Sequence, residues 1–258
     1  HTYLNDHHFH WGYFVYASSM VATYDPAWAA QWGPMVEMLI RDAASGDAND
    51  PLFPRLRNFD PYMGHSWAGG PAANYNGNDH ESSSEAMNFH AATILWGTAT
   101  DNQQMRDLGI YLYATELSGI VNYWYDVNDQ SFDQLGYQRE VVGRLWGGGV
   151  DYYTHFGTEP WKVVGIQAVP TSAAHLYLGR YPTKLAAVMD EMTALVGNDW
   201  GALKNYLWQM GALDDPANSI ALFNAQNAGG GYDYGTTTAE LYYFLHSIDG
   251  LGHVDRTV

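Results

Sequence analysis

The chain has 258 residues, of which 28 are acidic and 11 are Lys or Arg, so its formal net charge is −17 at pH 7. A field of this sign repels polyanions, and we therefore expect neither nucleic acid nor an anionic membrane surface as a partner. Hydrophobic residues make up 47% of the chain, which excludes intrinsic disorder, and the absence of cysteine excludes a disulfide framework, a thiolate zinc site and a cysteine nucleophile.

An apolar period of 3.6 residues predicts helices along most of the chain. The first two cover about 11–24 and 26–44, and the second has Asp25 and Pro26 at its start, where both residue types are favoured. Further helices are predicted over about 81–98, 105–125, 171–178, 182–196, 203–210, 216–227 and 236–247.

The sequence contains little that indicates a sheet. No alternating apolar pattern of useful length occurs, although the three glycines at 147–149 favour a short hairpin within 144–155. The predicted class is therefore all-α, with about nine helices in a single helical domain over 1–258. Alternating helices and loops of this number are typical of a helical toroid or of part of one.

Two long loops, at about 47–79 and 126–170, separate the predicted helices. Loops of this length are usually functional. Both are rich in Gly, Asn, Asp and aromatic residues. Within the second loop the stretch 150–156 is polar and aromatic, and a similar loop occurs at 226–234. Aromatic faces combined with amides and hydroxyls suit a neutral, ring-shaped ligand such as a sugar, so these loops predict a carbohydrate cleft.

The first candidate for chemistry is the segment 5–13, at the start of the first predicted helix. Asp6 lies in or just before the first turn, where the helix dipole favours an anion. A capping carboxylate beside surface histidines is the simpler interpretation. A metal site is another, because His7, His8 and His10 supply three imidazoles, although adjacent histidines on a helix point in different directions.

The second candidate is the pair Glu81 and Glu85. Their spacing of four residues places both carboxylates on one face of the helix predicted over about 81–98. A solvated helix face would tolerate them without consequence. However, the residues after Glu85 are apolar and aromatic, which indicates a buried helix whose start faces a wet cavity, where one carboxyl of a close pair has a raised pKa.

Four segments of the chain resemble a known family. NDHHFHWGYF at 5–14, FDPYMGHSWAG at 59–69, ESSSEAMN at 81–88 and GIQAVP at 165–170 are similar to segments of the family 81 glycoside hydrolases, the endo-β-1,3-glucanases. The resemblance implies an (α/α)6 barrel with an open cleft, preceded by a β-sandwich domain. Since twelve helices are implied and about nine are predicted, we expect a barrel that is incomplete at its N-terminus and a longer parent chain with N-terminal domains.

The resemblance also implies a mechanism and a site. The family hydrolyses its substrate with inversion, so Asp6 would be the general acid, Glu81 the general base and Glu85 a supporting carboxylate. The glucan would be bound by His10, Asp60, Tyr62, His65 and Trp67, with further contacts from Asp151, Tyr153 and Trp161. No metal or organic cofactor is implied, and the expected protein is a secreted hydrolase of laminarin-like or cell-wall β-1,3-glucan.

Three other functions are compatible with parts of the pattern. A non-catalytic glucan-binding protein would keep the aromatic loops without productive carboxylates. A polysaccharide lyase on a helical toroid would use His and Tyr to abstract a proton beside a uronate, but its anionic substrate favours a basic cleft, whereas this chain is strongly acidic. Metal-dependent hydrolysis would require the three N-terminal histidines.

Overall fold

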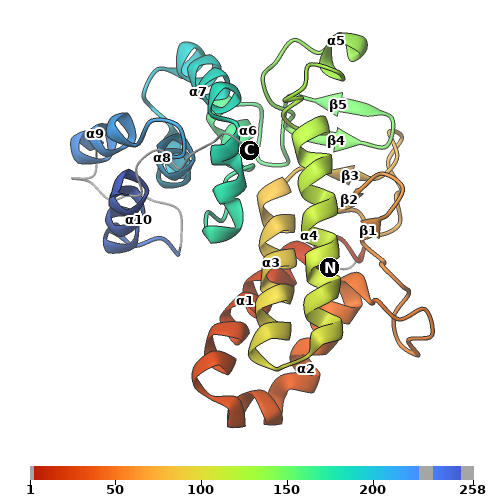
Figure 1. Ribbon diagram of the computed structural model, residues 1–258. Helices are drawn as coiled ribbons and strands as arrows, with labels where there is room; N and C mark the ends of the chain where they lie inside the picture. The colour runs from red at the N-terminus through yellow and green to blue at the C-terminus, as the bar shows by residue number, and fades with distance from the viewer. Residues whose placement is uncertain (1–2, 227–234, 251–258) are drawn as a thin grey trace. The chain divides into compact units, whose positions relative to one another are not determined.

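The computed structural model describes residues 3–226 and 235–250 (Figure 1). Its internal contacts divide into two compact units. Unit 1 consists of His1–Trp124 with Arg144–Asp151, and unit 2 consists of Tyr125–Gly143 with Tyr152–Val258. None of the described helices is long and apolar enough to cross a bilayer.

Unit 1 is built on four long helices, α1 (His7–Tyr24), α2 (Pro26–Ala44), α3 (Ser83–Ala99) and α4 (Gln103–Tyr123). Helix α1 packs against α2 and α3, and α3 packs against α4. Three of these helices begin at a side-chain cap: Asp25 accepts from the amide of Trp28, Ser82 from that of Glu85 and Asn102 from that of Met105. The core between the helices includes Val15, Ile40, Phe89, Trp96 and Leu112, all at most 1% exposed.

Short strands lie at one end of these helices. Strands β1 (Phe59–Asp60) and β2 (His65–Ser66) form an antiparallel pair, and β3 (Asp79–His80), β4 (Arg144–Trp146) and β5 (Gly149–Asp151) form a three-stranded antiparallel sheet. In the second sheet Asp79 pairs with Trp146, and Arg144 pairs with Asp151. The predicted hairpin within 144–155 is confirmed, and its first strand joins a segment more than 60 residues earlier in the chain.

Unit 2 contains shorter helices. They are α5 (Phe132–Leu135), α6 (Pro160–Gly165), the 3-10 helix η1 (Ala173–Arg180), α7 (Pro182–Val196), the 3-10 turn η2 (Gly201–Leu203), α8 (Lys204–Ala212), α9 (Pro216–Gln226) and α10 (Thr238–Gly250). Helix α8 is almost wholly buried because α9, α10, α6 and α7 all pack against it.

The predicted helical class is confirmed, and the differences from the predicted helices are local. Helix α1 begins at His7 rather than near Trp11. Helix α3 begins at Ser83 rather than at Glu81, because Ser82 caps it. The segment predicted as a helix over 171–178 is a 3-10 helix, and α5 and α6 are too short to produce a detectable apolar period.

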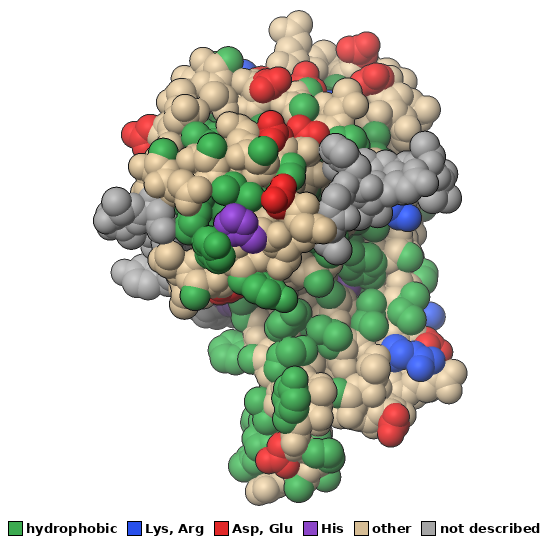
Figure 2. All heavy atoms as spheres, turned by 60° about the vertical axis from the view of Figure 1, so that its left-hand side comes forward, with side chains coloured by type: hydrophobic (Ala, Val, Ile, Leu, Met, Phe, Trp, Pro, Cys, Tyr) green, Lys and Arg blue, Asp and Glu red, His purple; other side chains and the backbone are tan. Residues whose placement is uncertain are grey.

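The outer faces of α1 and α2 expose large apolar side chains. Figure 2 shows hydrophobic atoms over the lower end of the molecule, where these two helices lie. The exposed residues on α1 and α2 include Tyr13, Phe14, Met20, Val21, Tyr24, Trp32, Met35 and Met38. Large contiguous apolar surfaces of this kind are typical of faces that contact other polypeptide.

Helices α3 and α4 lie close together at Gly97. A Cβ there would lie 2.3 Å from the amide nitrogen and 2.7 Å from the Cα of Arg106, both of which are backbone atoms. We therefore expect Gly97→Ala to lower the free energy of unfolding by about 1–3 kcal/mol, because the helices must move apart. Gly149→Ala is the control, since a Cβ at Gly149 meets nothing within 4 Å. Thermal unfolding followed by circular dichroism measures both, and equal melting temperatures would contradict the close approach.

Candidate active site

Four carboxylates gather at the strand end of unit 1, and we call Asp6, Asp79, Glu81 and Glu85 the acidic cluster. Two backbone hydrogen bonds connect its first two members: the amide of Asp6 donates to the carbonyl of Ala68 at 2.8 Å, and the amide of Ala68 donates to the carbonyl of Asp79 at 2.7 Å. Burial raises the pKa of Asp79, and the charges of Glu81 and Asp6 raise it further. The side chains therefore interact electrostatically although Asp6 is more than 70 residues from the other three in the chain.

Asp6 stands at the N-cap position of α1, as the sequence predicts, but its side chain does not cap the helix. Its backbone is left-handed, with φ 61° and ψ 17°. Aspartate tolerates this conformation better than most residues, yet it carries strain that surrounding contacts must hold, here the hydrogen bond to Ala68. The Asp6 carboxylate accepts from the side-chain amide nitrogen, Nδ2, of Asn5. The Asp6 carboxylate therefore makes no hydrogen bond to a backbone amide in the first turn of α1, as a capping aspartate would. This leaves the carboxylate available to a ligand.

Glu81 lies just before α3, so the prediction that Glu81 and Glu85 share one face of a helix is wrong. The cause is the cap at Ser82, which starts the helix two residues later. The Glu81 carboxylate accepts from Nη2 of Arg144 at 2.5 Å, and Nε of the same guanidinium lies 3.5 Å from Oδ2 of Asp79. One cation from β4 therefore contacts two carboxylates of the cluster.

Glu85 lies in the first turn of α3, and its carboxyl tends to keep its proton. Burial raises its pKa to about 7, and the charges of Asp6 and Glu81 contribute in the same direction, while hydrogen bonds from Ser82 and Tyr13 oppose the shift. The Tyr13 hydroxyl donates to Oε1 of Glu85 at 3.0 Å. At mildly acidic pH Glu85 therefore keeps its proton, beside a Glu81 that is paired with Arg144. A raised pKa on one carboxyl of such a pair agrees with the sequence prediction.

The β1–β2 hairpin presents aromatic and polar groups. The Asp60 carboxylate accepts from the amides of Tyr62 and Met63 and from Nε1 of Trp67. Burial opposes ionisation of Asp60, but these three hydrogen bonds outweigh it and lower its pKa. Asp60 therefore closes its own turn, whereas Tyr62 is 94% exposed and Trp67 is half-buried.

His65 differs from its prediction. Its side chain is 0% exposed and lies under Trp67, with ring centroids 4.4 Å apart. A fully buried imidazole does not reach a sugar in this conformation, so we assign His65 to the layer that supports Trp67. Both residues of β2 are buried, and the rings of Trp67, His80 and Trp124 pack around His65, which the local sequence does not reveal.

The remaining predicted residues lie in different parts of the chain. His10 is half-buried on α1, and Asp151 on β5 accepts from Nε1 of Trp146 at 2.7 Å. Tyr153 and Trp161 belong to unit 2, where both are half-buried. Most of the predicted loop at 226–234 lies outside the described residues.

The N-terminal histidines point to different partners. Nδ1 of His7 lies 2.5 Å from Oδ2 of Asp42, which also accepts from Nε1 of Trp11, whereas His8 is buried 5.6 Å from the ring of His80. Within residues 3–226 and 235–250 no group of three or more His, Cys, Asp or Glu is arranged to hold a metal ion.

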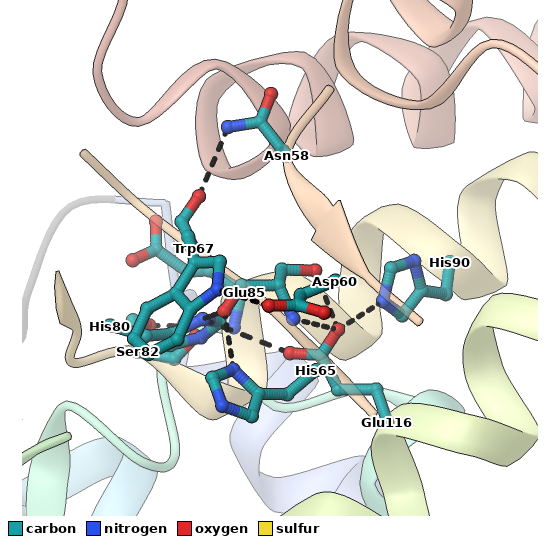
Figure 3. A network of polar contacts seen from close by, with 10 residues as sticks. Asn58, Asp60, His65, Trp67, His80, Ser82, Glu85, His90 and Glu116 are labelled. Carbon is teal, nitrogen blue, oxygen red and sulfur yellow. Dashed lines mark hydrogen bonds and ion pairs between the residues drawn. The ribbon is translucent and has the colours of Figure 1, made fainter. Parts of the chain in front are cut away.

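A buried polar network beneath the cluster was not predicted (Figure 3). Glu116 on α4 is 0% exposed, and its Oε2 accepts from the amide of Ser66 at 3.0 Å, from the Ser66 hydroxyl at 2.6 Å and from Nε2 of His90 at 2.7 Å. Arg144 was also missed. The sequence feature that could have pointed to Arg144 is the scarcity of Lys and Arg in this chain. No spacing in the sequence connects Glu116 with Ser66.

Comparisons with known proteins agree on one family. The family model for the glycosyl hydrolase family 81 C-terminal domain matches residues 1–240. A glucan endo-1,3-beta-D-glucosidase from Acetivibrio thermocellus is 42% identical over 99% of this chain, and one from Thermobifida fusca is 39% identical over 100% of it. Only 33% and 34% of those two proteins are covered, so the chain spans about a third of their length.

A comparison with solved structures points to the same family. A solved structure of a glycoside hydrolase family 81 protein from Clostridium thermocellum superimposes with a TM-score of 0.90 at 42% identity, covering 96% of this chain and 35% of that chain. The helical toroid implied by the resemblance is thereby confirmed as the fold to which these helices correspond. With a family model matched over most of its length, and with relatives and a solved structure that agree, the chain belongs to glycosyl hydrolase family 81 and corresponds to its C-terminal domain.

Proposed function

We propose that this chain is the catalytic part of an inverting endo-β-1,3-glucanase and that residues 1–258 act as one helical catalytic domain. The observation that carries the proposal is the acidic cluster, in which an Arg144-paired Glu81 lies near a Glu85 that holds a proton up to about pH 7. Acid and base chemistry requires carboxyls in both protonation states at one pH. Relatives at 39–42% identity that are named glucan endo-1,3-beta-D-glucosidases support the choice of substrate.

In the proposed mechanism Glu81 is the general base and Asp6 the general acid. Glu81 takes a proton from water, the water oxygen attacks the anomeric carbon, and Asp6 gives its proton to the leaving glycosidic oxygen. Inversion requires these carboxyl groups about 6.5–9.5 Å apart, so that a water molecule fits on the far side of the sugar. Glu85 supports the acid: two close carboxyls do not both ionise readily, so a proton is retained between Asp6 and Glu85.

The glucan is proposed to bind over the hairpin side of the cluster. Tyr62 and Trp67 offer ring faces to the sugars, and His10, Asp60 and Asp151 offer hydrogen-bonding groups. Tyr153 and Trp161 remain proposed contacts from unit 2. N-terminal domains of a longer parent chain are proposed as the polypeptide that covers the apolar faces of α1 and α2, and an extracellular location is proposed because polymeric glucan lies outside cells.

Substitution of the acid and the base tests the reaction. We expect Asp6→Asn and Glu81→Gln each to lower kcat on laminarin by at least 1,000-fold, because neither amide exchanges a proton. Proton NMR of fresh reducing ends from the unmodified protein is expected to show the α-anomer first. Asp107→Asn is the control, since Asp107 is an exposed residue on α4 whose carboxylate contacts its helix neighbours Arg106 and Gln103.

Several results would contradict this assignment. The β-anomer appearing first would exclude inversion, and full activity in Asp6→Asn would exclude Asp6 as the acid. Laminarin binding without any hydrolysis by the folded, unmodified protein would favour the non-catalytic glucan-binding function.

The pKa of Glu85 generates a prediction on pH. The carboxyl is protonated below about pH 7 and ionised above it, so we expect kcat to fall as pH rises through about 7, when the proton shared with Asp6 is lost. Glu85→Gln removes the carboxyl whose pKa lies near 7, so we expect the alkaline limb of kcat to move away from pH 7. Initial rates on laminarin between pH 4 and 9 measure this, and an alkaline limb that does not move would remove Glu85 from the acid pair.

A further inference from the structure

A layer of buried titratable residues lies directly beneath the acidic cluster. It consists of Glu116 on α4 with His8 on α1, His65 on β2, His80 on β3 and His90 on α3, each at most 1% exposed. Buried ionic groups of this kind rarely increase stability compared with an apolar core, so their presence calls for a specific role.

Glu116 is the anion of this layer. Burial opposes its ionisation, but the hydrogen bond from His90 and the charges of His90 and His80 outweigh burial and hold its pKa well below the usual range. Three donors converge on Oε2, namely the amide and hydroxyl of Ser66 and Nε2 of His90. The other oxygen, Oε1, has no hydrogen-bond partner among the described residues and lies 3.8 Å from Nδ1 of His80.

His80 is the cation that pairs with Glu116. Its Nδ1 lies 2.5 Å from the carbonyl oxygen of Ser66, and its Nε2 lies 3.2 Å from the carbonyl oxygen of Ser82. A carbonyl oxygen only accepts, so both ring nitrogens carry hydrogen, and the ring is an imidazolium. His65 and His8 favour the neutral ring, because burial lowers the pKa of each and the charge of His80 lowers it further.

The imidazolium is connected to the residues that the proposed reaction uses. His80 stands between Asp79 and Glu81 in the chain, and it holds the carbonyl of Ser82. The Ser82 hydroxyl in turn caps α3 through the amide of Glu85 and bonds the Glu85 carboxylate. Ser66, which bridges Glu116 and His80, lies next to Trp67 on the hairpin.

We propose that Glu116 holds His80 as an imidazolium, and that this buried ion pair is a positioning device for the acidic cluster and for Glu81 and Glu85 in particular. The inference rests on the proposed function for its catalytic consequence, but the charge state of His80 is independent of that function. Removal of the carboxylate leaves a buried cation without its counter-charge, so the ring loses a proton and one of its two carbonyl contacts.

The groups that face the pair come from every element packed around it. They are His8 from α1, His65 from β2, Asp79 from β3, His90 from α3 and Arg144 from β4, with Arg57 acting on His8. The cations among them disfavour a second proton on His80, and Asp79 and Glu116 favour it. Glu116 is the only one of these acids that is fully buried, and it is also the acid whose free oxygen faces the ring.

NMR of the imidazole nitrogens tests the pair directly. In the unmodified protein at pH 7 we expect both nitrogens of His80 to show the ¹⁵N shifts of an imidazolium, and we expect the ring to become neutral in Glu116→Gln. His80→Gln identifies the resonance by its disappearance. A neutral His80 in the unmodified protein at pH 7 would overturn the inference, whether or not the protein hydrolyses glucan.

Kinetics on laminarin test the positioning role. We expect Glu116→Gln to lower kcat at least tenfold at pH 7 while KM changes less than threefold, and part of the loss to be recovered near pH 5, because a lower pH favours the charged ring. Thr93→Val is the matched control, because Thr93 is buried on α3 but bonds only the carbonyl of Phe89. Equal losses at all pH values, or the same loss in Thr93→Val, would mean a purely structural role and overturn the proposal.

A second variant covers the case in which Glu116→Gln does not fold. His80→Gln cannot carry charge, so we expect it to lower kcat by a similar factor with no recovery at pH 5. The double variant is expected to be no worse than His80→Gln alone, since the two residues act as one unit. Unchanged kcat in folded His80→Gln would overturn the proposal. Absence of activity in the unmodified protein would instead count against the proposed function and leave the NMR result to decide the ion pair.

Discussion

The arrangement of unit 1 depends on the guanidinium of Arg144. In a chain of net charge −17, four carboxylates in one cluster repel each other, and a nearby cation is required to keep some of them ionised. Arg144 meets this requirement from β4, where it reaches Glu81 and Asp79 together. The same strand pairs with β3, so the sheet that brings the cation also carries Asp79, and Glu81 directly follows β3.

The cluster combines two electrostatic environments within a short distance. Glu81 lies beside a cation, whereas Glu85 lies in a buried turn with only neutral donors, and its pKa is raised to about 7. Asp6 is held at the strained start of α1 by a backbone hydrogen bond rather than by a capping bond of its own. The fold thus separates protonation states by burial and pairing, which is how carboxylates of the same type take different roles in acid and base chemistry.

Sequence reasoning was most successful where the signal is local. The boundaries of α2 and α7 follow from their proline starts and apolar period, and both were predicted to the residue. It failed at Glu81, because a serine cap moved the start of α3 by two residues, and at His65, because burial of a short strand depends on what packs over it. The (α/α)6 fold came from the resemblance of four segments and not from the helix count.

The composition and the motifs alone established a helical, acidic protein with carboxylates and aromatic residues in the segments that mark family 81. They could not establish which groups meet, since Asp6, Asp79, Glu116 and Arg144 are separated by tens of residues and have no shared period. Their meeting is decided by the packing of α1 on α3, of α3 on α4 and of β3 on β4. The pKa of a carboxyl depends on the distance to other charges and on water access, and both are properties of the folded chain.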